Sequence, residues 1–234
     1  MTHSKKSSTA FILAFIGVLI FSFTLPLTKY AIAHGMSAPF IALGRTVLAA
    51  TAALIFIISK GEKLPPRALW RDIVLSSLGV VIGFPLFSSL ALQTVPSSHA
   101  IVFNGLLPLA TAVVASFLFH QKQPRLFWLI AALGAAVVAT YNAYHVGFDA
   151  SQFELADGWM LLAVLICAMG YAYGARVSSQ MSGILTICWA LIFALPITLP
   201  ATIWVAAQQS HWPSDALTWG AFLYLALMSQ LIGF

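Results

Sequence analysis

A single arginine interrupts the apolar segment "FIALGRTVLAATAALIFIIS", which runs from Phe40 to Ser59. A permanent charge inside a membrane-spanning helix is costly, so an ionisable residue there indicates a functional site or a specific structural contact. Arg45 lies about six residues, roughly 9 Å along the axis, from the N-terminal end of this helix. From that depth its side chain can reach the nearer interface or bond a neighbouring backbone carbonyl. This structural role has the stronger argument, and contact with an anionic group of a substrate stays open as the alternative.

Two polar residues lie on one face of a later apolar segment. Asn104 and Thr111 are seven residues apart, which places them on the same side of a helix, and Pro108 lies between them. A proline has no N–H, so it leaves free the carbonyl four residues earlier, here that of Asn104. This patch is suited to face a solute, and a hydrogen bond from Asn104 to a neighbouring helix is the equal alternative.

Three further residues could line a solute cavity from other apolar segments: Thr24, Tyr171 and Trp189. Hydroxyl groups and aromatic rings suit a solute that has both polar and apolar parts. For Trp189, a lipid-facing position is an equally good interpretation. The candidate substrate-binding residues are therefore Arg45, Asn104, Thr111, Thr24, Tyr171 and Trp189.

The positions of the acidic residues and histidines argue against proton coupling and metal binding. Every Asp and Glu maps to a loop or a helix boundary, and four fall in outer loops, namely Asp149, Glu154, Asp157 and Asp215. We therefore expect no membrane-embedded carboxylate for proton coupling, which favours facilitated movement or exchange. His99 and His120 lie at opposite ends of one helix, roughly 30 Å apart, and cannot share a metal ion. We expect no catalytic residue, no metal and no cofactor, and the sequence has no P-loop for an ATP-driven pump.

The elements that must position these residues follow from the composition. Hydrophobic residues make up 61% of the 234-residue chain and charged residues only 7%, and the mean hydropathy is +0.95. Apolar runs of roughly 20 residues have the length that crosses a bilayer as a helix. We expect an all-α, polytopic transmembrane helix bundle with spans at 10–33, 39–59, 73–92, 100–119, 126–141, 159–175 and 184–207, and an eighth run from 216. Because that run is still apolar at Phe234, we expect the sequence to be incomplete at its C-terminal end.

The basic residues predict the orientation, because Lys and Arg stay on the cytoplasmic side of a membrane. With a cytoplasmic N-terminus, that side holds nine of the eleven basic residues, namely Lys5, Lys6, Lys60, Lys63, Arg67, Arg71, Lys122, Arg125 and Arg176. We expect a plasma membrane, such as the bacterial inner membrane. The same bias accounts for the pI of about 9.4, so no nucleic-acid partner is expected.

A weak internal repeat divides the chain into two units. A shift of about 146 residues superposes the sixth expected span on the first, with a similar order of long helix, short return and proline-bearing helix. Five spans separate the copies, so the second copy runs the opposite way through the membrane, as in the inverted repeats of secondary transporters. The expected units are residues 1–145, with five helices, and residues 146–234, with helices 6, 7 and part of 8.

Glycines and prolines predict close packing and bends within the spans. The segment "GVVIG", from Gly79 to Gly83, has the small-xxx-small spacing that lets helices approach closely. Prolines permit kinks that could absorb a rocking motion between two halves. The residues expected to pack or bend helices are Pro26, Gly79, Gly83, Pro85, Pro108, Pro196 and Pro200.

A longer stretch resembles a known family. The run "ALQTVPSSHAIVFNGLLPLATAVVASFLFHQKQP", which begins at Ala91, resembles the end of the third helix and the whole fourth helix of EamA-type members of the drug/metabolite transporter superfamily. Arg45 also stands at the place of an arginine in the family's second helix. The resemblance implies ten helices in two inverted five-helix repeats, with both termini inside. One residue departs from the family's pattern: Gln121 stands where the family usually has a glutamate.

Secondary transport of small organic metabolites is the function that these features favour. The resemblance implies solutes such as amino acids or related compounds, moved mostly outward, by alternating access. The alternatives are an intramembrane enzyme or lipid-processing protein, which requires convergent catalytic groups, and a non-transporting structural subunit. The expected partners are a small-molecule metabolite and the lipid bilayer. The substrate, the coupling ion and the direction are not fixed by the sequence, and a homodimer stays open.

Overall fold

The computed structural model describes residue 12 and residues 15–120, 123–146 and 155–233. These residues form helices and no strand, which confirms the expected all-α bundle. Six of the helices are long and apolar enough to cross a membrane, and two shorter apolar helices cover Arg125–Val137 and Ala216–Ile232. Gln121, Lys122, Asp149 and Glu154 lie outside the described residues.

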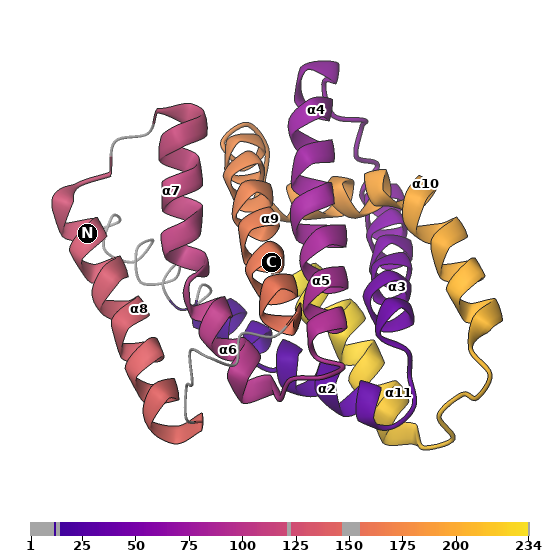
Figure 1. The fold of residues 1–234 in the computed structure, drawn as a ribbon. Coiled ribbons are helices and arrows are strands. Elements are labelled where there is room, and N and C mark those ends of the chain that lie inside the picture. The colour runs from indigo at the N-terminus through magenta and orange to yellow at the C-terminus, as the bar shows by residue number, and fades with distance from the viewer. Residues whose placement is uncertain (1–11, 13–14, 121–122, 147–154, 234) are drawn as a thin grey trace.

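The helices follow the expected spans in the expected order (Figure 1). The first span, Phe15–Ala33, contains α2 (Thr24–Ala33), and the second is α3 (Ala38–Lys60). The third consists of α4 (Arg67–Ser76), the π-helix η1 (Ser77–Gly83) and α5 (Phe84–Ala91). The others are α6 (Ser97–Gly105), α7 (Leu107–Phe119), α8 (Arg125–Val146), α9 (Leu155–Ser178), α10 (Gly183–Gln208), α11 (Ala216–Leu223) and the π-helix η3 (Tyr224–Ile232).

Local sequence explains where several helices begin and end. Ser182 is the extended N-cap of α10, and its hydroxyl accepts a hydrogen bond from the Leu185 N–H at 3.4 Å. Asp215 caps α11 in the same way by accepting from the Thr218 N–H at 2.8 Å, and these bonds to Thr218 lower the pKa of the Asp215 carboxyl. Gly61 ends α3 with a φ of 62°, a left-handed conformation that glycine adopts without steric cost.

Prolines interrupt some spans and not others. Pro108 stands at the start of α7, and Leu106 separates this helix from α6. Pro85 stands at the second position of α5, two residues after the end of η1. Pro196 and Pro200 both lie inside α10, which stays one helix through them. The breaks at Pro85 and Pro108 therefore leave backbone carbonyls open for contacts from neighbouring helices.

Helices α3 and α10 lie along each other, and α10 is at the edge of the bundle opposite α8 (Figure 1). Helix α9 packs against α4, η1 and α5 on one side and against α7 on another, while α2 packs against α11. Helix α8 contacts α6 and α7 and lies at the edge of the bundle (Figure 1). This arrangement encloses the middle of the third span and the first half of α3.

The third span and α9 cross at very short range. A Cβ added at Gly79 would lie 2.5 Å from the carbonyl oxygen of Ile166 and 2.6 Å from the Cα of Gly170. A Cβ added at Gly170 would lie 2.7 Å from the backbone nitrogen of Val80, and one at Gly83 would meet the Ile166 side chain. Because these neighbours are mostly backbone atoms, the two helices cannot keep this distance with larger residues.

Gly170→Ala is expected to destabilise the bundle, because the added methyl group forces α9 away from η1. Overpacking of this kind costs about 1–3 kcal/mol. Gly158→Ala is the matched control on the same helix, since a Cβ there meets nothing within 4 Å. The unfolding temperature of both variants is measured in detergent. Unfolding is detected by the reaction of a thiol dye with Cys167 and Cys188, which are buried in the folded protein. A Gly170→Ala protein as stable as Gly158→Ala would contradict the close crossing.

Candidate functional site

Arg45 is enclosed by the protein rather than extended to its surface. The residue is 1% exposed, and its Nε and Nη2 atoms have no hydrogen-bond partner among the described residues. All seven successive residues from Phe40 to Thr46 are buried, so α3 is covered on every side at this level. The expectation that Arg45 reaches the interface or bonds neighbouring carbonyls is therefore wrong. It failed because depth along one helix does not reveal that other helices surround it.

One backbone carbonyl joins three elements, one of them through the residue that follows Arg45. The carbonyl oxygen of Val81, in η1, accepts hydrogen bonds from Thr46 Oγ1 at 3.0 Å and from Gln230 Nε2 at 3.1 Å. Pro85 lies four residues after Val81 and has no N–H to offer it, which leaves this carbonyl open. Thr46 belongs to α3 and Gln230 to η3, so the bond pair ties α3 to both π-helices. Such π-helical turns are rare in proteins overall, but those that occur are frequently found at functional sites.

Helices α2, α3 and η3, which pack against one another, carry a set of fully enclosed polar side chains, here called the polar cluster. Its members are each at most 1% exposed and are Thr24, Thr28, Arg45, Thr46, Ser229 and Gln230. The hydroxyls of Thr24 and Ser229 are hydrogen-bonded at 2.6 Å, and Thr28 donates to the Thr24 carbonyl at 2.7 Å. The amide oxygen of Gln230 has no partner within the described part of the chain. The cluster therefore keeps two donors, on Arg45, and one acceptor, on Gln230, open.

The other candidate residues are distributed over the bundle. Thr24 belongs to the polar cluster, whereas Tyr171 and Trp189 lie in or against the main apolar core, where Trp189 contacts the Phe193 ring edge to face at 6.5 Å. Thr111 donates to the Leu107 carbonyl of its own helix at 2.8 Å. The Oδ1 atom of Asn104 is buried without a partner among the described residues. Binding roles for these residues stay predictions.

The sequence analysis did not select Thr46, Ser229 or Gln230. A signal for the last two was present, because the adjacent polar pair at positions 229 and 230 interrupts the apolar run "YLALMSQLIGF". Ionisable and amide residues inside a span call for the same attention as Arg45. Thr46 could not be selected in this way, since threonines are common in apolar helices and its partner is a carbonyl 35 residues away.

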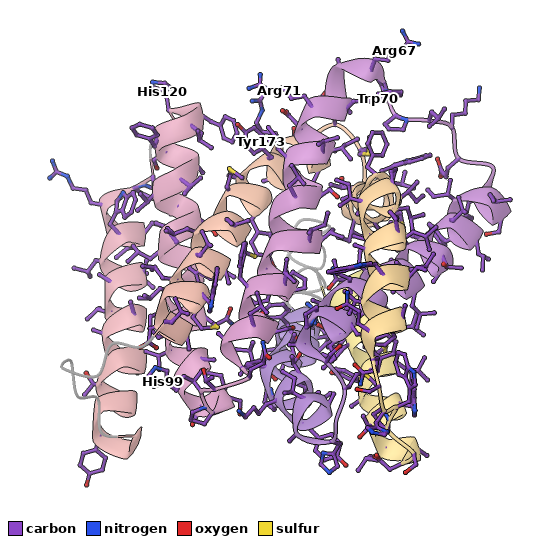
Figure 2. The ribbon with its side chains drawn as sticks, turned by 45° about the vertical axis from the view of Figure 1, so that its right-hand side comes forward. Arg67, Trp70, Arg71, His99, His120 and Tyr173 are labelled. Carbon is purple, nitrogen blue, oxygen red and sulfur yellow. The ribbon has the colours of Figure 1, made fainter. Side chains whose placement is uncertain are left out.

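Two ion pairs join helices at the ends of the bundle. His99 Nε2 lies 2.5 Å from Asp157 Oδ1, and Asp157 is 4% exposed. The assignment of Asp157 to an outer loop is therefore wrong: α9 begins at Leu155, earlier than expected, and includes it. At the opposite end, the Arg176 Nε lies 3.5 Å from Asp72 Oδ2. Figure 2 shows His99 at one end of the bundle and His120, Arg67, Arg71 and Tyr173 at the other.

The described residues contain no group of three or more His, Cys, Asp and Glu side chains that could hold a metal ion. Each of the pairs above joins one basic side chain to one carboxylate, and both involve helix ends. Arg176 is further placed by a cation–π contact, with its guanidinium carbon 4.6 Å from the centre of the Phe119 ring. These pairs tie α9 to its neighbours at both ends, and the polar cluster lies elsewhere, on α2, α3 and η3.

Thr46→Val and Gln230→Leu are expected to be more destabilising together than the sum of the single changes. In either single variant the Val81 carbonyl keeps one donor, and a hydrogen bond within a membrane protein contributes only about 1 kcal/mol. The double variant leaves the carbonyl buried and unpaired, which adds about 1–3 kcal/mol. A double-mutant cycle of unfolding free energies measures this coupling. Strict additivity would show that the two donors do not share one acceptor.

Comparison with known proteins gives the chain a family. The EamA-like transporter family model matches residues 8–142. The uncharacterized transporter YdeK of Bacillus subtilis is 36% identical over 233 residues, which cover 98% of this chain and 78% of YdeK. The uncharacterized inner membrane transporter YedA of Escherichia coli K12 is 29% identical over 139 residues, or 59% of this chain and 43% of YedA.

A third relative is similar over almost the same length. A probable biotin transporter of Pseudomonas aeruginosa is 26% identical over 229 residues, which cover 94% of this chain and 76% of the relative. The family match extends over more than half of the chain, and the membrane-length helices agree with it. The chain belongs to the EamA-like transporter family and is a multi-pass membrane transporter.

Proposed function

We propose that the protein is a secondary transporter that moves small organic solutes by alternating access between two inverted repeats. The main observation in support is the position of the two π-helices. A shift of about 146 residues moves the range of η1, Ser77–Gly83, onto residues 223–229, and η3 covers Tyr224–Ile232. Because π-helices are rare, two of them at matching positions support an internal repeat rather than chance packing. Residues 1–145 and 146–234 are the proposed units.

Helix bounds support the same division. The shift moves the range of α3, Ala38–Lys60, onto residues 184–206, and α10 covers Gly183–Gln208. Both helices follow a serine N-cap in an extended conformation, Ser37 and Ser182. The family model's match to residues 8–142 covers the first unit and ends near the proposed boundary.

The contacts between helices also exchange in the way that a two-fold relation requires. Helix α9 packs on the third span, and its counterpart in the first unit, α2, packs on α11 and η3. At the first crossing Gly170 faces Gly79, with Gly83 nearby; the shift relates Gly170 to Thr24 and Gly83 to Ser229, which are hydrogen-bonded at the second crossing. Helices α3 and α10, which lie along each other, are the second helices of the two proposed units.

The surroundings of the polar cluster support a small organic solute. Two donor atoms of Arg45 and the amide oxygen of Gln230 have no partner within the described residues, and elsewhere in the bundle the apolar core with Tyr171 and Trp189 offers aromatic surface for a hydrocarbon part. Arg45, Asn104, Thr111, Thr24, Tyr171 and Trp189 are the proposed solute contacts. The name of the Pseudomonas relative specifies biotin, a small organic molecule, which agrees with this class for the family. We further propose export across a bacterial inner membrane, with the N-terminus in the cytoplasm.

Flux measurements test the transport function. Liposomes that contain the full-length protein are loaded with a panel of amino acids, their amides, monocarboxylic acids and neutral vitamins, and efflux is followed by mass spectrometry. We expect saturable efflux of at least one solute without ATP, because the chain has no P-loop to use it. Efflux of every panel member at the rate of protein-free liposomes would contradict the proposed function.

Alternating access predicts opposite changes at the two ends of the third span. Ser76 and Ser89 are buried serines 13 residues apart on this span, a separation of about 20 Å along a helix. Each is replaced by cysteine in a protein whose Cys167 and Cys188 are changed to alanine. Addition of the transported solute should raise maleimide reactivity at one position and lower it at the other. Changes in the same direction, or at neither position, would contradict alternating access.

A further inference from the structure

Helix α9 is tied to the first proposed unit at both of its ends. In its first turn, Asp157 Oδ1 lies 2.5 Å from His99 Nε2 on α6. In its last turn, Arg176 Nε lies 3.5 Å from Asp72 Oδ2 on α4. The 19 residues from Asp157 to Arg176 extend about 28 Å along a helix, close to the thickness of the hydrocarbon core of a bilayer. The two pairs therefore lie at opposite faces of the membrane, and Figure 2 shows His99 at one end of the bundle and Tyr173, three residues before Arg176, at the other.

An aromatic contact accompanies each of these pairs. At the His99 end, the ring of Trp159 on α9 stacks on Phe87 of α5, with the ring centres 5.5 Å apart. At the opposite end, the ring of Tyr173 on α9 meets Phe119 of α7 edge to face at 5.2 Å. At each end α9 thus contacts both the third and the fourth span of the first unit, one span through the polar pair and the other through the aromatic pair. The two spans exchange these partners between the ends.

Burial of the two carboxylates determines when each pair can part. Asp157 is 4% exposed and Asp72 is 8% exposed, whereas the side chains of their basic partners are 23% and 48% exposed. A buried carboxylate that loses its basic partner is strongly unfavourable unless water replaces that partner. An end of the bundle that opens admits water to its own carboxylate and not to the one at the closed end. Each pair can therefore part at low cost only while its own end is open.

A backbone contact between the two pairs supplies a pivot for α9. Gly170 lies 13 residues after Asp157 and six before Arg176, and a Cβ added to it would lie 2.7 Å from the backbone nitrogen of Val80 in η1. Because the contact joins two backbones, its distance is fixed more firmly than that of a contact between long side chains. A tilt of α9 about this point moves one of its ends away from the first unit and the other end toward it.

From these observations we infer that the two pairs are the gates of the transporter. The His99–Asp157 pair holds one end of the solute pathway closed, and the Asp72–Arg176 pair holds the opposite end closed. The inference rests on the proposed function, because alternating access requires one end to stay closed while the other is open. During the cycle α9 tilts about its glycine contact, and one pair parts while the other is kept. Both pairs are formed in this structure, which corresponds to a state that is closed at both ends.

The test breaks one pair at a time and measures which end opens. The reporters are the single cysteines Ser76→Cys, toward the Arg176 end of the third span, and Ser89→Cys, toward its His99 end, in the full-length protein without its native cysteines. His99→Leu should raise maleimide reactivity at position 89 and lower it at position 76, each by about threefold or more, because it favours the state open at the His99 end. Arg176→Gln should give the reverse pattern, with the larger reactivity at position 76.

Two exposed basic residues provide matched controls. His120 and Arg71 form no ion pair with a carboxylate among the described residues. His120→Leu and Arg71→Gln should therefore leave the maleimide reactivity of both reporters at the wild-type values. If His99→Leu or Arg176→Gln does not fold, Asp157→Asn and Asp72→Asn decide in their place, because each keeps the size of the side chain and removes its charge.

Purely structural pairs give a different pattern. In that case the variants at both ends would lower the unfolding temperature, while the reactivities at positions 76 and 89 would stay at the wild-type values or change in the same direction. Either result would overturn the inference. Alternating access would still stand if the transported solute changed the two reporters of the wild type in opposite directions. A wild type that transports no solute would instead overturn the transport function itself.

Discussion

The enclosure of the Arg45 guanidinium is a constraint that the interior of this protein must satisfy. In a bilayer no water is present to satisfy a buried polar group, so each must find a partner inside the protein or in a ligand. Arg45 is 1% exposed, and its Nε and Nη2 atoms have no hydrogen-bond partner among the described residues. The next residue on the same helix, Thr46, donates to the Val81 carbonyl, which Pro85 cannot engage and which Gln230 shares. The bonds that join α3 to η1 and η3 thus do not involve the arginine.

The proposed two-fold relation between the repeats pairs two helix crossings that have different roles in the proposed motion. These two crossings differ in chemistry. At one crossing Gly79 and Gly170 bring two backbones into contact, and at the other Thr24 and Ser229 meet through their hydroxyl groups. A glycine crossing is rigid because its distance is fixed by backbone atoms, whereas a hydroxyl pair can exchange its partner for a solute at little cost. In the proposed mechanism the solute binds at the Thr24–Ser229 crossing, and the Gly79–Gly170 crossing transmits the motion between helices.

The sequence predicted the elements far better than the contacts between them. Span order and type follow from runs of apolar residues, which need no knowledge of neighbours. The sequence singled out Arg45, yet its burial could not be predicted, because α3 packs against α10, η3 and α5, which come from distant parts of the chain. The burial of Asp157 was not predicted, because a carboxylate near the end of an apolar run was assigned to a loop. Its partner, His99, is 58 positions away, so the pairing is not visible in the local sequence. The π-helices and the Val81 bonds likewise depend on long-range packing.

The most direct test of the central claim observes the Arg45 guanidinium itself. The chain has five arginines, namely Arg45, Arg67, Arg71, Arg125 and Arg176, so the Nε–H signals of protein labelled with ¹⁵N-arginine are few, and Arg45→Lys identifies the one in question. A transported solute that contacts Arg45 should shift this signal saturably, and a solute that is not transported should leave it in place. An Arg45 signal that does not respond to any transported solute would contradict the account.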